Sequence, residues 1–318
     1  MNTTVNVNRP PAQPAVQPPV VPSVPPPVVR APLPAHEYHQ RLGVERPAAW
    51  RGIVALLLLM GGMLAFSLFI GGAAFLIEMG IRGEMPTGLT PLTLAGAMVA
   101  LAMLTPWSML LQKWFFKVPM VSLHSIINRF RWDIFGRTLA IVVPLWALLQ
   151  LVYPVLMPQP SIEYGPGEAL AYIVIALTLV PLQSMGEEYA FRGLAFRIAA
   201  SWGRGPRAAL VLGIAVSSVL FMLAHFALDP WLNIYYLTFG VALALITWRT
   251  GGLEAAVVLH AVNNALAFTI GVALRQDLDA GFDRSVGAAS AVMLIPSAVL
   301  VLIALIVWWR TSRAARAE

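Results

Sequence analysis

The chain has no cysteine among its 318 residues. This absence excludes disulfide bonds, thiolate metal sites, lipidation on a cysteine and a cysteine nucleophile. Any catalytic chemistry in this protein therefore has to use oxygen and imidazole groups.

Charged side chains are also scarce. They make up 11% of the chain, whereas a typical soluble domain has about 25%, and hydrophobic residues make up 58%. A chain of this composition cannot present an ordinary wetted surface, so it is interpreted as an integral membrane protein. It also contains no motif that would bind nucleic acid.

Apolar runs recur along the chain, and each is long enough or nearly long enough to cross the hydrocarbon core of a bilayer. Backbone that crosses a membrane must satisfy its own hydrogen bonds, so these runs predict helices rather than loops. The second run contains two prolines and the sixth is short, so these two are the least certain of the predicted transmembrane helices. The prediction is an all-α polytopic bundle of about eight transmembrane helices, near 53–76, 90–112, 138–157, 169–189, 208–227, 231–248, 252–273 and 287–309.

The composition divides the chain into three parts. Residues 1–50 form a Pro-rich tail, in which Pro, Val and Ala crowd without an amphipathic period, and this predicts a disordered cytoplasmic segment. Residues 51–310 form the membrane domain. Residues 311–318 form a short basic tail.

The basic residues predict the orientation. In the eight-helix arrangement, 17 of the 21 Lys and Arg residues lie on the face that both termini share, and three lie on the other face. By the positive-inside rule both termini are cytoplasmic, in a multi-pass protein of the cell (inner or plasma) membrane. The net charge of +6 favours contact with anionic lipid headgroups. The use of 19 Arg against two Lys, in a chain rich in Ala and Pro, hints at a bacterial source.

A few polar side chains interrupt the apolar helices. Ionisable groups at such depth usually face a bundle interior or an aqueous cavity, where they serve transport or chemistry. Glu188 and Arg192 are four residues apart on one helical face, so they can form an ion pair. Glu187 is rotated from them by about 100° and stays free. The full set is Glu187, Glu188, Arg192, His225, His260, Asn263 and Asn264.

Spacing suggests which of these residues meet. Glu187 lies 16 residues before Gly203 and His225 lies 19 after Pro206, so both stand at a similar height above the turn between their helices. His260 and Asn264 share a helical face and could donate two hydrogen bonds to one point. Such preorganised donors are what a developing oxyanion requires.

Three fragments follow one another along the chain: Glu187-Glu188-Tyr-Ala-Phe-Arg192, Phe221-Met-Leu-Ala-His225 and His260-Ala-Val-Asn-Asn264. They match the EExxxR, FxxxH and HxxxN motifs of the CPBP family of intramembrane proteases. This family includes the CAAX prenyl protease 2 (Rce1-type) enzymes and the bacterial Abi proteins. The resemblance covers a motif core over residues 165–270.

The resemblance implies a role for each matched residue. Glu187 would be the general base that activates water, and His225 would help to hold or deprotonate that water. His260 and Asn264 would stabilise the tetrahedral oxyanion. The remaining residues would support them: Glu188 and Arg192 as an ion pair, Phe221 by packing, and Asn263 beside Asn264.

Metal use is left open by the residues. Two histidines and a carboxylate, here Glu187, His225 and His260, could hold zinc with one position open for water. The spacing is not HExxH, so no single helix supplies a zinc-binding face. A metal-independent mechanism that depends on glutamate is the favoured prediction, and zinc is the alternative.

The predicted activity is hydrolysis of a peptide bond in a membrane-associated or lipidated polypeptide. Two other functions remain open. Buried Glu and His residues could relay protons in a transporter, although the chain shows no paired inverted repeats of the kind that transporters have. The same bundle could also be a catalytically silent scaffold, in which the isolated histidines and asparagines only hold helices together.

Overall fold

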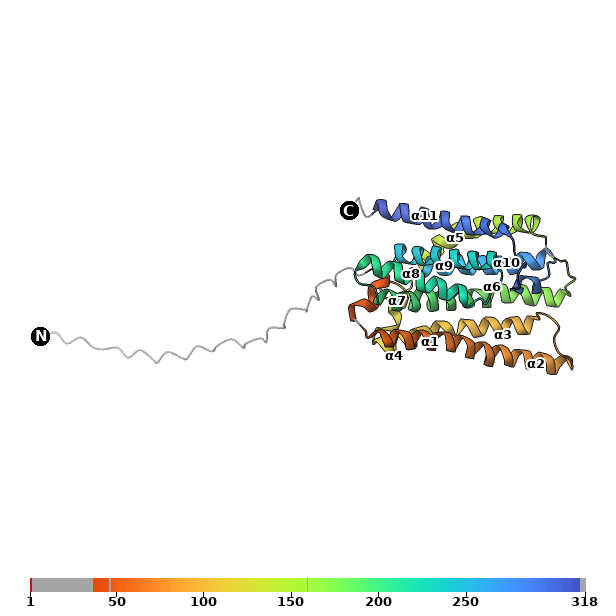
Figure 1. The fold of residues 1–318 in the computed structure, drawn as a ribbon, viewed down its shortest axis with the longest axis horizontal. Helices are drawn as coiled ribbons and strands as arrows, with labels where there is room; N and C mark the ends of the chain where they lie inside the picture. The colour runs from red at the N-terminus through yellow and green to blue at the C-terminus, as the bar shows by residue number, and fades with distance from the viewer. Residues whose placement is uncertain (2–36, 46, 159, 315–318) are drawn as a thin grey trace. The chain divides into compact units, whose positions relative to one another are not determined.

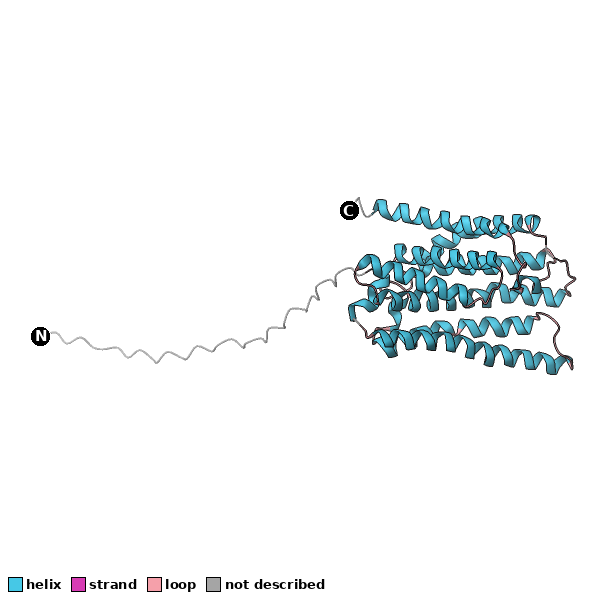
Figure 2. Ribbon diagram, in the orientation of Figure 1, coloured by secondary structure: helices cyan, strands magenta, loops and turns pink. Residues whose placement is uncertain are grey.

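The structure, a computed structural model, describes residues 1, 37–45, 47–158 and 160–314. The chain divides into Met1–Ala35 and His36–Glu318, and all of the first unit except Met1 lies outside the described residues. The second unit is helical throughout, and the described part of it contains no strand (Figure 2). The predicted all-α fold is confirmed.

Eight helical segments among the described residues are long and apolar enough to cross a membrane, which confirms the predicted number and supports a multi-pass membrane protein. Three of them contain a break or a π-helical stretch. The spans are α1 (Ala49–Phe66) with η2 (Ser67–Gly71) and α2 (Gly72–Arg82); α3 (Pro91–Ala102) with α4 (Leu104–Phe116); α5 (Trp132–Leu156); α6 (Pro166–Glu188) with η4 (Tyr189–Ala195) and α7 (Phe196–Ser201); α8 (Pro206–Leu223); α9 (Pro230–Thr250); α10 (Glu254–Ala273); and η6 (Ala291–Met293) with α11 (Leu294–Ala314). Shorter 3₁₀ segments are η1 (Tyr38–Glu45), η3 (Met120–Leu123) and η5 (Asp279–Phe282).

Two of the prolines that interrupt the sequence pattern, Pro91 and Pro230, start helices. Pro91 occupies the first turn of α3 behind Thr90, whose side chain forms a capping box with Thr93. Pro230 likewise follows Asp229, whose carboxylate accepts hydrogen bonds from two backbone amides of α9. Proline suits this position because the first-turn amide needs no partner within the helix.

Two predicted helix ends are wrong. The fourth span does not end at residue 189, because the π-helical η4 carries the chain on through α7 to Ser201. The fifth ends at Leu223 instead of 227, since Phe226 adopts φ +50° and turns the chain toward α9. His225 therefore lies in the turn after α8 and not on the helix.

The predicted tail over residues 1–50 also needs correction. Residues 2–36 lie outside the described residues, but Tyr38–Glu45 forms η1, and Tyr38, His39 and Leu42 are buried. These apolar and aromatic side chains pack against the bundle, which the Pro-rich composition of the preceding residues does not indicate. At the other end, α11 extends to Ala314, and residues 315–318 lie outside the described part.

Helices α6 and α10 lie at the centre of the bundle, with α3 against α6 and α5 against α10 (Figure 1). Among the eight described spans, α10 is the most buried and α5 the least. Small side chains let α10 occupy this position, because they allow neighbouring backbones to approach. Alanines at 255, 256, 261 and 265 are all buried.

Gly186 brings the second span against α6 one residue before Glu187. A Cβ at this position would clash with the backbone carbonyl oxygen of Leu101, near the break between α3 and α4. A backbone atom cannot rotate away as a side chain can. The close approach therefore requires glycine.

We expect Gly186→Ala to lower the thermal unfolding midpoint in detergent, because overpacking of this kind typically destabilises by about 1–3 kcal/mol. Gly80→Ala is the matched control, since an added Cβ there meets nothing within 4 Å. Equal midpoints for the two variants would contradict the inferred constraint.

Candidate active site

The two adjacent glutamates stand where α6 becomes π-helical. Glu188 is the last residue of α6, and η4 begins at Tyr189. Single π-helical turns within α-helices occur frequently at functional sites. Both carboxylates are buried, Glu188 completely and Glu187 with 7% of its surface exposed.

Glu188 pairs with Arg192, as the four-residue spacing predicts. Arg192 Nη1 donates to Glu188 Oε1 at 3.0 Å, and both side chains are fully buried. The guanidinium also lies over the Phe221 ring, 3.9 Å from its centroid. A cation over an aromatic face is stabilised electrostatically, more so away from water. Phe221 thus packs directly on the ion pair.

His260 joins the ion pair to the second glutamate. Its Nδ1 lies 2.7 Å from Glu188 Oε1, at hydrogen-bond distance, and its Nε2 lies 3.6 Å from Glu187 Oε2. Because Glu188 is an acceptor that is already paired with Arg192, the natural assignment is that Nδ1–H donates to it. His260 Nε2 then faces Glu187.

Glu187 has one bound oxygen and one free oxygen. Gln183 Nε2 donates to Oε1 at 2.6 Å. Oε2 has no hydrogen-bond partner among the described residues. Glu188 Oε2 also lacks a hydrogen-bond partner, but the other oxygen of Glu188 is held by Arg192 and His260. Glu187 has no arginine contact and lines the cavity, so of the two glutamates it is the one available to accept a proton.

Asn264 sits beside the glutamates on α10. Its Nδ2 lies 3.3 Å from Gln183 Oε1 and 3.4 Å from Ser184 Oγ, both of them long hydrogen bonds. Asn263 Nδ2 donates to Asn264 Oδ1 at 2.8 Å. This fixes the amide of Asn264 with its NH₂ group toward α6.

Asn263 holds α10 against two neighbouring helices. Its Oδ1 accepts from Trp146 Nε1 on α5 at 2.8 Å and from the Tyr235 hydroxyl on α9 at 3.3 Å. Its backbone oxygen accepts from Gln150 Nε2 at 3.2 Å. Asn263 is therefore a helix-joining residue whose amide also orients Asn264.

His225 also packs against Phe221, with ring centroids 4.6 Å apart in an edge-to-face arrangement. Its Nδ1 donates to the Phe221 carbonyl oxygen at 2.7 Å, which leaves Nε2 as the open nitrogen. The imidazole stacks on Tyr236 with ring centroids 3.8 Å apart. His225 and Glu187 line the same cavity, and His260 is the histidine that lies 3.6 Å from the Glu187 carboxylate.

These side chains open into a single cavity of about 740 Å³. Glu187, His225, His260 and Asn264 all line it, and the rest of the wall is largely apolar. This volume is in the range of pockets that bind small ligands or short peptide segments.

The candidate zinc ligands are Glu187, His225 and His260. Within the described part of the chain, no three His, Asp or Glu side chains come together as a group that could hold a metal ion. The Nδ1 atoms of His225 and His260 are engaged by the Phe221 carbonyl and by Glu188, which leaves both Nε2 atoms open, as in metal-binding histidines. The metal-independent mechanism therefore stays a prediction.

Gln183 and Ser184 were missed by the sequence reasoning. Gln183 precedes Glu187 by four residues, so the same spacing rule that pairs Glu188 with Arg192 could have identified it. Nothing in the sequence signals Tyr236 as the residue that stacks on His225, because the contact joins α9 to the turn after α8.

Together the fold and site define a class of protein: a helical membrane protein with a carboxylate, imidazoles and amides around a buried cavity. Residues 168–266 match the model of the type II CAAX prenyl endopeptidase, Rce1-like, family. The resemblance that the three motifs carry is thus confirmed for this region, and the match supports a CAAX-type intramembrane protease.

A curated relative is the uncharacterized protein YyaK of Bacillus subtilis (strain 168), which is 35% identical over 109 residues. The aligned part is 32% of this chain and spans about a third (35%) of the relative's length. No solved structure matches the chain.

We expect Arg192→Met to destabilise the protein strongly. The variant leaves the Glu188 carboxylate buried without its cation, and breaking a buried pair in this way typically costs about 3–5 kcal/mol. The measurement is the thermal unfolding midpoint in detergent, followed by tryptophan fluorescence.

The double variant Glu188→Gln with Arg192→Met is the matched control. It removes both charges, so its midpoint should lie closer to that of the unmodified protein than the single variant does. A double variant that is less stable than Arg192→Met alone would show that the ion pair is not the dominant interaction.

Proposed function

We propose that the chain is an intramembrane endopeptidase that hydrolyses a peptide bond of a membrane-associated or lipidated polypeptide. The observation that carries this proposal is the Glu187 carboxylate. One of its oxygens is held by Gln183 and the other is unpartnered, with His260 Nε2 at 3.6 Å, at the wall of a 740 Å³ cavity. The match to a protease family supports it.

In this proposal Glu187 is the general base. Its free oxygen takes a proton from a water molecule, and the water oxygen attacks the carbonyl carbon of the substrate. His225 lines the same cavity with its Nε2 open, and from there it would help to hold the water or the substrate.

The attack moves negative charge onto the carbonyl oxygen. His260 would stabilise this oxyanion from its Nε2 side while Nδ1 continues to donate to Glu188. Asn264 Nδ2 would be a second donor, since its present hydrogen bonds are long and easily exchanged. Donors fixed before the reaction stabilise such an intermediate without reorganisation.

Collapse of the intermediate breaks the C–N bond. The proton held by Glu187 passes to the leaving nitrogen, so the products are a carboxylic acid and an amine, and Glu187 is again ionised. Glu188 and Arg192 would support this chemistry by fixing His260, and Phe221 and Asn263 by packing and by orienting Asn264.

Glu187→Gln tests the proposal. The amide keeps the size of the side chain but cannot accept the proton, so we expect loss of cleavage with little loss of stability. Peptide termini in the membranes of the producing cell are compared by mass spectrometry for the two proteins at equal expression. Termini that require the unmodified protein would establish proteolysis and identify the substrate.

Glu168→Gln is the matched control, because Glu168 lies in the first turn of the same helix and does not line the cavity. It should leave the profile unchanged. Identical profiles for the unmodified protein and a folded Glu187→Gln variant would overturn general-base catalysis. Proton-coupled flux that depends on Glu187 would then favour a transporter, and co-purification with a partner without cleavage would favour a scaffold.

Metal dependence is tested separately. We expect purified protein to retain cleavage of an identified substrate after treatment with a metal chelator and dialysis, since Glu187, His225 and His260 are not grouped as ligands. Loss of activity that added zinc restores, and other divalent ions do not, would instead establish the zinc mechanism.

A further inference from the structure

The cavity is lined by one end of the bundle. Besides the site residues, its wall includes residues 224–226 in the turn between α8 and α9, and residues of the 276–289 segment between α10 and α11. The lining residues include none from the described connections 117–131, 202–205 and 251–253 at the other end.

Backbone contacts confirm that the loops at the cavity end lie together. Leu228 N donates to Arg284 O at 2.8 Å, and Ile162 N donates to Arg275 O at 2.8 Å. Gly287 N donates to the Asp229 carboxylate at 2.9 Å. The loops between α5 and α6, α8 and α9, and α10 and α11 thus form one face, the cavity face.

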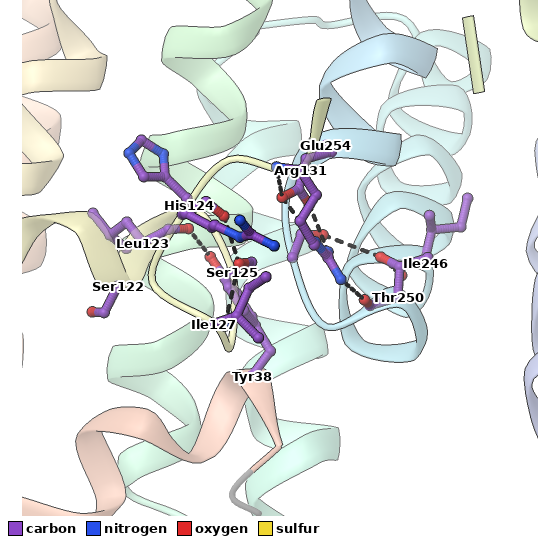
Figure 3. Close-up of polar contacts among 12 residues, drawn as sticks. Tyr38, Ser122, Leu123, His124, Ser125, Ile127, Arg131, Ile246, Thr250 and Glu254 are labelled. Carbon is purple, nitrogen blue, oxygen red and sulfur yellow. Dashed lines mark hydrogen bonds and ion pairs between the residues drawn. The ribbon is translucent and has the colours of Figure 1, made fainter. Parts of the chain in front are cut away.

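The opposite end of the bundle is closed by a buried ion pair. Arg131 Nη2 lies 2.6 Å from Glu254 Oε2, and Arg131 Nε and backbone N both donate to Glu254 Oε1 at 2.9 Å (Figure 3). Arg131 Nη1 also donates to the Thr250 carbonyl oxygen at 2.7 Å. Glu254 is completely buried.

The 3₁₀ segment η1 adds a second closure at that end. The Tyr38 hydroxyl donates to Leu123 O at 2.7 Å, and the Arg197 guanidinium lies 4.0 Å from the centre of the Tyr38 ring. Burial raises the pKa of Tyr38 to about 12, against the opposing effect of Arg197, so its hydroxyl remains a donor at neutral pH. Arg197 Nη2 donates to Ser122 O at 2.6 Å.

The closed end is also the basic end. Of the 17 Lys and Arg residues that the structure describes, 13 belong to this side of the helices, whereas the cavity face carries Arg82, Arg275 and Arg284. The positive-inside rule places the basic end in the cytoplasm. The cavity face then lies on the extracytoplasmic side of the membrane.

We infer that the substrate reaches the site from the extracytoplasmic side, and that the scissile bond belongs to a membrane-inserted or outer-leaflet polypeptide rather than to a cytosolic lipidated tail. The class of substrate in this inference rests on the proposed function. The side of the membrane from which the cavity is reached does not. The apolar wall, which includes Met63 and Leu149, suits an apolar segment.

The depth of the site limits the form of this segment. His260 lies 13 residues before Ala273, the cavity-face end of α10, which corresponds to about 20 Å along the helix. An extended chain needs about six residues to cover that distance. The substrate therefore enters as an unwound segment rather than as a short side-chain anchor.

The absence of cysteine makes a direct test simple, because any introduced thiol is the only one in the chain. Ala267→Cys places a thiol on α10 in the cavity wall. A charged, membrane-impermeant thiosulfonate is added either to spheroplasts, which expose the extracytoplasmic face, or to inverted membrane vesicles, which expose the cytoplasmic face. We expect modification in spheroplasts and none in inverted vesicles.

Two control variants show how an inaccessible thiol and a cytoplasmic thiol behave in the same assay. Val257→Cys lies on the same helix near the closed end, is 3% exposed and lines no part of the cavity, so it should react from neither side. Arg204→Cys lies in the exposed turn between α7 and α8 and should react only in inverted vesicles.

The outcomes separate the two proposals. Reaction of Ala267→Cys in inverted vesicles alone, from both sides or from neither would overturn extracytoplasmic access, whatever the catalytic activity. Reaction in spheroplasts with no cleavage difference for Glu187→Gln would leave the access route standing and overturn the protease. If both hold, cleaved termini that map to cytosolic tails would contradict the substrate class.

Discussion

The structure depends on how the membrane interior accommodates the buried charge of Glu188. An isolated carboxylate in such surroundings would be strongly destabilising, and it persists only with close partners. Arg192 supplies the cation within the same helical segment, and His260 supplies a hydrogen bond from α10. Phe221 of α8 covers the guanidinium. Three segments that are distant in sequence are thus tied to one carboxylate.

This arrangement also decides what is left for chemistry. Glu188 takes both the arginine and the Nδ1 atom of His260, whereas Glu187 has no arginine contact, and its Oε2 lies 3.6 Å from the remaining imidazole nitrogen. Gly186 makes the geometry possible, because it allows the backbone of the second span to lie against α6 at this level. The two glutamates are neighbours in sequence, but Glu188 is held in an ion pair and Glu187 lines the cavity.

The bundle is asymmetric along its axis. One end is closed by buried contacts of Arg131, Glu254, Tyr38 and Arg197, whereas the loops of the other end line the cavity. Most of the basic residues that the structure describes belong to the closed end. Closure at one end shields the buried cluster around Glu187 and Glu188 from water on that side. The cavity leaves a path for a ligand from the other end.

The sequence by itself determined the features that depend on local pattern. Apolar run length gives the eight spans, and four-residue spacing gives the Glu188–Arg192 pair, because both follow from helix geometry alone. Only the tertiary structure decided that His260 contacts both glutamates while His225 stacks on Tyr236, and that Glu254 is buried. These contacts join separate helices, and packing sets how those helices are rotated and how far they are shifted along their axes. The spacing of apolar residues within a single helix does not determine that packing.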